Sequence, residues 1–187
     1  MAVFVFKEHI VAETTLSASQ VQFAKLARNT GVEVAVVPET DDDPIEWVRV
    51  NGLNSFNPGM EETFQDTTAF ENDGAGSQDK TGYTWAPVLG LIQRANADGD
   101  MDPGQKILAD TAGKLGPGSK IFYRQWERDG GPECYEGIVS PQWTPSEGDP
   151  NAVRNISVTL HGDGPRHKID NPYPAGTNGD DEGGSGE

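Results

Sequence analysis

The sequence contains little cysteine and few basic residues. One cysteine occurs in 187 residues, so no disulfide can form within the chain. Lys and Arg number 14 against 30 Asp and Glu, which gives a formal net charge of −16. A surface this acidic repels phosphate groups and disfavours binding to nucleic acid or to anionic membranes. The charge fits a role in solubility alone, or a protein that lies close to DNA without adhering to it.

Long apolar runs are also missing, and none approaches the length that spans a bilayer. The opening Ala-Val-Phe-Val-Phe at residues 2–6 is too short for the core of a signal peptide and follows no basic region. We therefore expect a soluble protein made in a reducing cytoplasm. In that setting Cys134 packs as a small apolar side chain.

Motifs that carry catalysis are absent from the sequence. It has no Gly-x-Ser-x-Gly, P-loop or Cys-x-x-Cys. The three histidines are too scattered for a metal site by spacing: His9, His161 and His167. Acids alternate as in a calcium loop at Asp98, Asp100 and Asp102, but Pro103 and Ala109 stand where that loop needs glycine and glutamate. We expect no enzymatic activity, no cofactor and no metal.

One helix is clearly indicated. Asp102 suits the N-cap and Pro103 the first helical position. Apolar and small residues then recur with helical spacing at Ile107, Leu108, Thr111, Ala112 and Leu115. The run Gly-Pro-Gly at 116–118 ends the pattern, so we predict a helix over about 103–115.

Most other patterned segments favour strands. Residues 32–37 and 45–50 are strand-like, and the apolar groups on both faces of 45–50 suggest a central strand. Residues 120–127 and 134–139 form a hairpin around the turn at 129–132, and 153–160 alternates cleanly before a polar turn at 162–166. Because proline cannot donate a hydrogen bond within a sheet, Pro87 predicts that 83–92 is an edge strand or a bulged strand. Together with the helix, these segments predict a mainly β protein, an antiparallel β-sandwich or partial barrel with one flanking α-helix.

We expect a single β domain over residues 1–175. The pattern of its first 44 residues does not predict one secondary structure. Residues 18–29 fit a helix between Ser17 and Gly31, but they also alternate like a strand. Residues 176–187 contain only small, polar and acidic residues and cannot join a core. They are predicted to form a flexible acidic C-terminal tail.

The most informative segment is a long loop over residues 53–80. From Leu53 to Asp79 it has six acids and no Lys or Arg, yet it carries Phe56, Phe64 and Phe70. A structureless loop of this length inside a compact domain is uncommon and usually functional. Its aromatic rings need a surface that buries them, and a neighbouring subunit is the natural candidate.

The order of small signatures along residues 45–165 resembles one family. A Trp-bearing strand runs into Val-Asn-Gly-Leu-Asn-Ser-Phe-Asn-Pro at 50–58, then Glu61-Glu62 and Asp-Thr-Thr-Ala-Phe at 66–70. Next come Gly-Tyr-Thr-Trp at 82–85, the Asp-capped helix, a Phe-Tyr-Arg strand, Tyr-Glu-Gly at 135–137 and Ile-Ser-Val-Thr-Leu-His-Gly-Asp-Gly at 156–164. This succession resembles the major tail tube proteins of long, flexible-tailed (siphovirus-type) bacteriophages.

The resemblance implies a structural virion protein of the phage tail, assembled in the host cytoplasm. Its subunits would form six-membered rings that stack into a tube through which DNA passes. The net charge of −16 adds the expectation of a negatively charged lumen that conducts DNA without binding it. The long loop would reach neighbouring subunits, with expected contacts at Phe56, Pro58, Phe64, Thr67, Phe70 and Tyr83. Other implied partners are the tape measure, tail terminator and distal tail proteins, and no membrane is involved.

Two other interpretations remain at this stage. A head-decoration or tail-terminator protein would also be an acidic assembly subunit without catalysis. A carbohydrate-binding β-sandwich would use exposed rings among Trp47, Trp85, Trp126 and Trp143, although the strand positions of three of them favour core packing.

Overall fold

The computed structural model describes residues 29–40, 42–146 and 152–174. The acidic tail predicted at 176–187 lies outside these residues. So does the segment 18–29, predicted as helix or strand, except for Asn29. The described elements are β1 (Thr30–Val36), β2 (Val48–Arg49), β3 (Leu53–Asn57), β4 (Met60–Asp66), η3 (Phe70–Asn72), β5 (Gln78–Trp85), β6 (Val88–Ile92), α1 (Pro103–Thr111), η4 (Gly116–Ser119), β7 (Ile121–Glu127), β8 (Tyr135–Pro145) and β9 (Asn155–Lys168).

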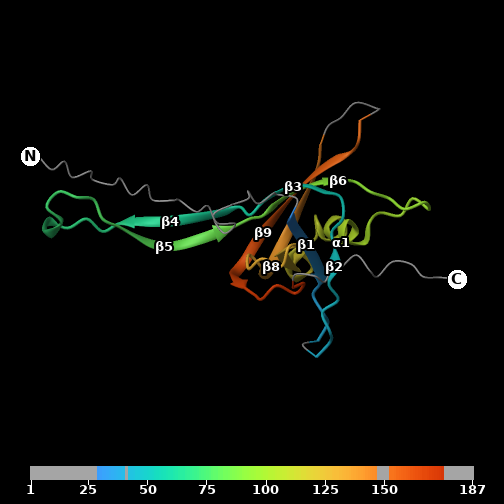
Figure 1. The fold of residues 1–187 in the computed structure, drawn as a ribbon, viewed down its shortest axis with the longest axis horizontal. Coiled ribbons are helices and arrows are strands. Elements are labelled where there is room, and N and C mark those ends of the chain that lie inside the picture. Colours follow the sequence, from blue (N-terminus) through green and yellow to red (C-terminus); the bar gives the residue numbers. More distant parts are fainter. Residues whose placement is uncertain (1–28, 41, 147–151, 175–187) are drawn as a thin grey trace, which may run out of the picture.

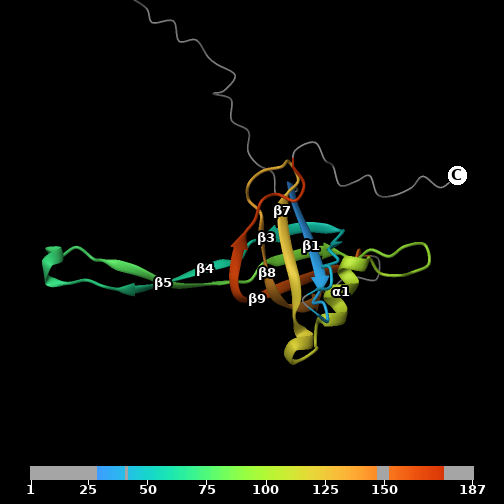
Figure 2. The same cartoon turned by 90° about the horizontal axis from the view of Figure 1, so that it is seen from below.

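Seven strands form one antiparallel sheet in the order β2-β1-β7-β8-β9-β6-β3. The sheet curls into a half-barrel, and α1 packs against β1, β2 and β8 (Figures 1 and 2). The remaining strands, β4 and β5, pair only with each other and project away from the half-barrel. The expected mainly β fold, a partial barrel with one flanking helix, is confirmed.

The core lies on the face of the sheet that turns toward α1. It is built from alternate residues of the strands together with Leu108 of α1, and its buried members are Val32, Val34, Val50, Trp85, Leu89, Leu91, Leu108, Ile121, Tyr123, Val139, Ile156, Val158 and Leu160. The alternation predicted for 153–160 is therefore confirmed: its apolar positions are buried and its polar positions face the other way.

Trp85, the last residue of β5, is buried in this core. Its ring lies 6.2 Å from that of Tyr123, and its Nε1 donates to the carbonyl oxygen of Gly164 at 2.9 Å. A Cβ atom at Gly162 would come within 2.3 Å of the indole ring. Glycine at this position of β9 therefore makes room for Trp85.

The helix begins as predicted. The Asp102 side chain accepts a hydrogen bond from the backbone N–H of Gln105 at 3.1 Å, and Pro103 takes the first helical position. The helix ends at Thr111, about one turn before the predicted 115. Gly113, with φ at 86°, follows the end in the left-handed region that glycine favours.

A buried glutamine that the sequence pattern did not single out ties α1 to the sheet. Gln105 is fully buried, and its Nε2 donates to the carbonyl oxygens of Asn51 at 2.7 Å and Ile92 at 2.9 Å. Buried polar groups are tolerated when they are bonded in this way. The sequence did contain a signal for this contact, because Gln105 is a polar residue on the apolar face of the predicted helix.

Two strand predictions need correction. The strand predicted at 45–50 is only two residues long and lies at the edge of the sheet, since β2 pairs with β1 alone among the described strands. Trp47, just before β2, lies over the guanidinium of Arg124. The segment 83–92 divides at Pro87 into β5 and β6, and β6 lies inside the sheet between β3 and β9. Pro87 interrupts the strand without making β6 an edge.

Two loop predictions are also wrong. Residues 162–166 are not a turn, because β9 continues to Lys168 and pairs with β8 through a register shift between Glu136 and Ile138. Residues 53–80 are not structureless, because they contain β3, β4 and the first three residues of β5. The predicted hairpin of β7 and β8 is confirmed, with β8 running six residues further, to Pro145.

Candidate assembly surfaces

The first candidate surface is the hairpin of β4, η3 and β5, which we call the arm (residues 60–85). Its two strands pair from Met60 opposite Trp85 to Asp66 opposite Gln78. All seven residues of β4 are exposed, and Trp85 alone is buried in β5. The arm is therefore joined to the core at Trp85 and has no core of its own.

Local hydrogen bonds shape the far end of the arm. The Asp66 carboxylate accepts from the Thr68 N–H at 2.8 Å, and the Thr67 N–H donates to the Ser77 carbonyl at 2.9 Å. The Thr68 hydroxyl and N–H together lower the pKa of Asp66. Lys80 of β5 pairs with Glu62 of β4. These bonds order the arm through polar contacts alone.

Apolar side chains nevertheless stand out along the arm. Phe70 is fully exposed and Phe64 is 51% exposed within the described part of the chain, and Met60 and Tyr83 are also exposed. Exposed aromatic rings of this kind are typical of interaction surfaces. Nothing in the described fold covers the ring of Phe70.

The six residues predicted to contact neighbouring subunits all lie on β3, the arm or the turn between them. Phe64, Phe70 and Tyr83 are exposed on the arm, as described above. Thr67 bonds within the arm, its hydroxyl 3.1 Å from that of Ser77, and Pro58 lies in the turn before β4. Phe56 differs, since its ring is half-buried against the core of its own subunit. Contact with a neighbour remains a prediction for all six.

The second surface is the side of β3, β6, β9 and β8 that faces away from the core, here called the polar face. The strand register aligns Asn57, Val88, Thr159 and Gln142 in one row and Ser55, Gly90, Ser157 and Thr144 in the next. Between these rows lies the core row that contains Leu89 and Val158. The two rows therefore share the face opposite the core.

No charged residue occurs in the strand segments that form this face, namely β3, β6, residues 140–145 of β8 and residues 155–160 of β9. Charged residues make up 24% of the whole chain. A four-strand face without Asp, Glu, Lys or Arg is therefore a marked local departure from the composition.

Both margins of the polar face are strand edges. β3 pairs with β6 on one side, and no described strand lies on its other side. β7 pairs with β8 only at Tyr135–Val139, so residues 140–145 of β8 pair with β9 alone among the described strands. Unpaired edges are templates for pairing with another chain. The face has one such edge at each margin.

A third surface covers the outer side of β1 and β7, opposite the core. Here the buried Glu33 of β1 accepts a hydrogen bond from Nε of Arg124 at 2.9 Å, and Trp47 lies over the guanidinium at 4.3 Å. Tyr173 donates to Glu33 as well. Burial and this hydrogen bond raise the pKa of the Tyr173 hydroxyl. The network holds the segment before β2 and the residues near 173 against the sheet.

The tryptophans are used mainly for packing. Trp85 and Trp126 are buried, Trp143 packs against the core and Trp47 covers Arg124. Among the described residues, no group of three or more His, Cys, Asp or Glu side chains could hold a metal ion. None of the described helices is long and apolar enough to cross a membrane.

A solved structure shares this architecture. A chain of the SPP1 tail tube, solved by solid-state NMR and cryo EM, aligns with a TM-score of 0.53 at 12% identity, covering 78% of this chain and 80% of that one. The fold is that of a phage tail tube protein. Chains from the tail of an empty gene transfer agent particle and from a native gene transfer agent virion align with TM-scores of 0.49 and 0.48. The identities are 16% and 13%, and the alignments cover 78% and 76% of this chain and 99% and 97% of theirs. No protein-family model and no curated protein sequence matches the chain.

Proposed function

We propose that this protein is a major tail tube subunit, a structural virion protein that assembles with copies of itself into stacked rings. The observation that carries the proposal is a tail-tube fold in which one uncharged sheet face ends in two open strand edges. A face of this kind is suited to continue from one subunit to the next. The role is mechanical and requires no catalytic residue.

Ring closure follows from pairing unlike edges. Edge β3 of one subunit adds to residues 140–145 of β8 in the next, so that four strands per subunit join a continuous barrel. This contact is head-to-tail, and a rotation that closes it produces a ring. The family resemblance gives six subunits per ring. Closure removes the exposed edges that otherwise promote aggregation.

The polar face would then line the channel. Its hydroxyl and amide groups solvate a passing DNA duplex, and they provide no cation to hold a phosphate. The sequence suggested an acidic lumen, but the strand segments of this face carry neither acid nor base. We therefore propose a neutral wall, with the negative charge of the chain on other surfaces and at the rims of the channel.

The arm would connect rings. It projects well beyond the half-barrel (Figures 1 and 2), so it can reach another subunit. Stacking through such a contact does not close on itself and gives a tube. The tape measure inside the tube and the terminator and distal proteins at its ends would be the other partners, placing this protein in the virion tail after assembly in the host cytoplasm.

Negative-stain microscopy of the purified protein tests this proposal directly. We expect hollow filaments of uniform width, formed alone or on a tail-initiation complex. Particles that remain monomeric or form only small closed oligomers under both conditions would contradict a tube and would favour a decoration or terminator role.

A deletion variant can remove most of the arm with little disturbance to the half-barrel. Glu61 and Thr84 face each other in the ladder, so residues 62–83 can be replaced by Asn-Gly, which forms a two-residue hairpin turn. We expect this variant to fold as a monomer and to form no tubes. Normal filaments from the variant would show that the arm is not needed for stacking.

A further inference from the structure

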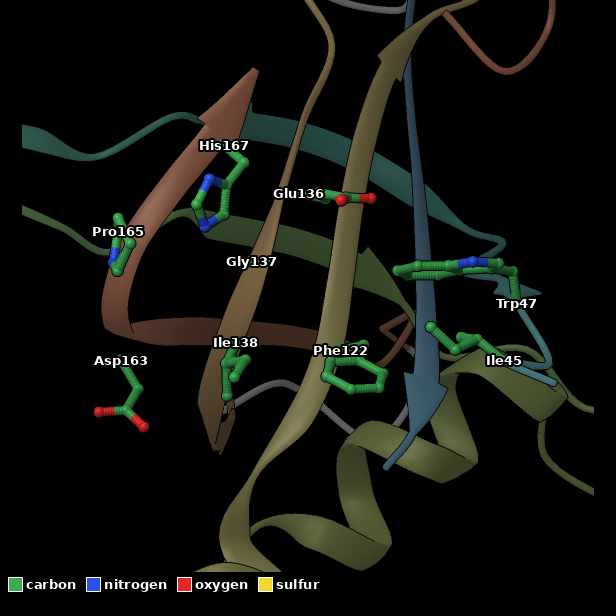
Figure 3. Close-up of a pocket in the computed structure, with 9 residues that line it drawn as sticks. All are labelled: Ile45, Trp47, Phe122, Glu136, Gly137, Ile138, Asp163, Pro165 and His167. Atoms are coloured by element: carbon green, nitrogen blue, oxygen red, sulfur yellow. The ribbon is translucent and has the colours of Figure 1, made fainter. Parts of the chain in front are cut away.

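The outer side of the sheet carries a groove across β7 and β8. Two adjoining hollows share Phe122 and Ile138, and together we call them the outer groove. Toward one end it is lined by Ile45 and Trp47, as Figure 3 shows, and toward the other end by Val37. Ile45, Val37 and Ile138 are exposed in the described part of the chain, and Phe122 is half-buried. Large apolar side chains gathered on a concave surface are typical of a binding site.

The charged side chains of the outer groove leave it slightly negative. Its lining holds two carboxylates, those of Glu136 and Asp163, and one ammonium group, that of Lys120. Lys120 pairs with Asp163, which leaves the lining with a net charge of −1 from Glu136. Arg124 stands opposite Glu136 in the ladder, but it pairs with the buried Glu33. The groove therefore fits an apolar occupant of neutral or slightly positive charge and disfavours an acidic one.

Several segments that could cover the outer groove are acidic. The run from Leu53 to Asp79, which includes the arm tip, has six acids and no Lys or Arg. Residues 147–151 and 175–187, outside the described part of the chain, together have six acids, no Lys or Arg, and no Val, Leu, Ile or aromatic residue. None of these segments combines apolar side chains with a charge that the groove favours.

Residues 1–28 have the composition that the groove requires. They hold two Lys and one Arg against two Glu, a net charge of +1 in a chain whose total is −16. Transfer of apolar side chains out of water is favourable, so a stretch rich in them gains by covering an apolar surface. Such a stretch lies at residues 2–11, whose large apolar members are Val3, Phe4, Val5, Phe6, Ile10 and Val11.

The connection to β1 brings residues 1–28 within reach of the outer groove. The carbonyl oxygen of Asn29 accepts a hydrogen bond from the Arg128 N–H at 2.7 Å, and β1 then begins beside the end of β7. Ala35 of β1 pairs with Phe122, so the groove lies about 20 Å along the strand from Asn29. An extended segment of this length spans up to about 90 Å, which is enough to turn back and cover the groove. A tethered segment acts at a roughly millimolar effective concentration, which favours it over a second copy in dilute solution.

We propose that the outer groove is the docking site for residues 2–11 of the same chain, whose apolar side chains pack against Phe122, Ile138 and Ile45. Docking would cover the apolar side chains that the outer side of the sheet otherwise exposes, and it would leave the arm and both strand edges free. The contact lies within one subunit, so it does not depend on tube formation. The proposed assembly and this contact can therefore fail separately.

Thiol labelling of dispersed subunits tests the contact. In a Cys134→Ala background, Ile138→Cys places a thiol in the groove at a position that is 36% exposed, and Val153→Cys, at a 62% exposed position outside the groove lining, is the control. We expect removal of residues 1–28 to speed maleimide labelling of Ile138→Cys about tenfold or more, as when the effective concentration of a tethered segment exceeds its dissociation constant about tenfold. Labelling of Val153→Cys should not change. Equal rates for Ile138→Cys with and without residues 1–28 would overturn the proposal.

Point substitutions keep the test valid if the shortened chain folds poorly. Phe4→Ser combined with Phe6→Ser should speed labelling of Ile138→Cys in the full chain. Phe23→Ser is the matched control, because it changes a ring outside residues 2–11, and it should leave the rate unchanged. Unchanged labelling of the double variant, or faster labelling with Phe23→Ser alone, would contradict docking through residues 2–11.

Cross-linking identifies the chain that supplies the segment and leaves every apolar residue of the contact in place. A Cys134→Ala chain that carries both His9→Cys and Ser119→Cys should be joined within the monomer by a short bis-maleimide, because Ser119 lines the groove. The absence of a link, or a link only between chains, would overturn the proposal.

The same labelling experiment separates the remaining occupants. Protection of Ile138→Cys should persist when the protein is diluted and when residues 62–83 are replaced by Asn-Gly. Loss of protection on dilution would show that a second copy covers the groove. Loss of protection in the Asn-Gly variant would show that the arm covers it. Either result would overturn docking of residues 2–11.

Discussion

The half-barrel and the arm are two regions of one chain that are held together by different forces. In the half-barrel, alternate side chains of seven strands and Leu108 of α1 bury a continuous core. In the arm, Trp85 is the sole buried residue of the two strands, and cross-strand hydrogen bonds with a few polar contacts maintain the hairpin. An isolated two-stranded hairpin is marginally stable in water.

This difference separates folding from assembly. Burial of apolar area is the dominant stabilising term, and nearly all of it lies in the half-barrel. The exposed rings of the arm contribute little to the free energy of unfolding of one subunit. They can contribute only when a second surface covers them. Substitutions in the two regions should therefore affect different measurements.

The largest effect is expected where the two regions meet. Trp85→Ala removes a large buried core side chain and its hydrogen bond to Gly164, and it leaves a cavity beside Gly162. We expect a loss of about 3–5 kcal/mol in the free energy of unfolding. Urea denaturation measures it, and both folding and assembly should suffer. A loss below about 1 kcal/mol would mean that the arm and the body are less firmly joined than the contacts indicate.

The next effect tests the body at its outer side. Arg124→Met leaves the Glu33 carboxylate buried without its cation, and Glu33 is only 3% exposed. We expect a loss of about 3 kcal/mol, measured by urea denaturation. The double variant with Glu33→Gln should recover part of that loss, because the buried carboxylate is replaced by a neutral amide. Equal stabilities for the single and double variants would contradict a buried ion pair.

The sequence predicted the body better than the arm for a physical reason. Strand alternation at 153–160 and the Asp102 cap are local signals, and both predicted the observed structure. The position of a strand within a sheet is set by long-range pairing, so the short edge strand β2 and the internal strand β6 were misplaced. The acidic loop was predicted to be functional from its three phenylalanines, which stays a prediction. Its hairpin was missed because its residues are almost all exposed and show no apolar alternation.

Local patterns could not predict the uncharged polar face either. It combines residues from four strands that are far apart in the sequence. Ser55, Gly90, Ser157 and Thr144 become one row only through the register of four strands. The polar face therefore depends on the topology, which the sequence pattern did not determine.

A smaller effect comes from alkaline pH and again concerns the body. Burial raises the pKa of the hydroxyl groups of Tyr123 and Tyr173 and of the Cys134 thiol. A group whose pKa is higher in the folded state stabilises the fold fully below its unfolded pKa, and this contribution is lost as the pH rises toward the folded value. Stability should therefore fall from about pH 9, by up to about 1.4 kcal/mol per pH unit for each group. Urea midpoints between pH 8 and 11 measure the slope, and Tyr173→Phe should reduce it. A flat profile would contradict the burial of these groups.

The smallest effect on stability is also the sharpest test of the comparison, because it uses the same substitution in both regions. Phe56 packs against the core, whereas Phe64 is half-exposed on the arm. Phe56→Ser should therefore lower the free energy of unfolding by about 2 kcal/mol, in keeping with loss of a partly buried ring. Phe64→Ser should change it by less than about 0.5 kcal/mol, as surface substitutions usually do. The effect on filament formation should be specific to Phe64→Ser, which weakens assembly although the subunit is fully folded. Urea denaturation and light scattering of the two variants measure both quantities. If Phe64→Ser assembles normally, the exposed rings of the arm are not an assembly surface, and the separation of folding from assembly does not hold.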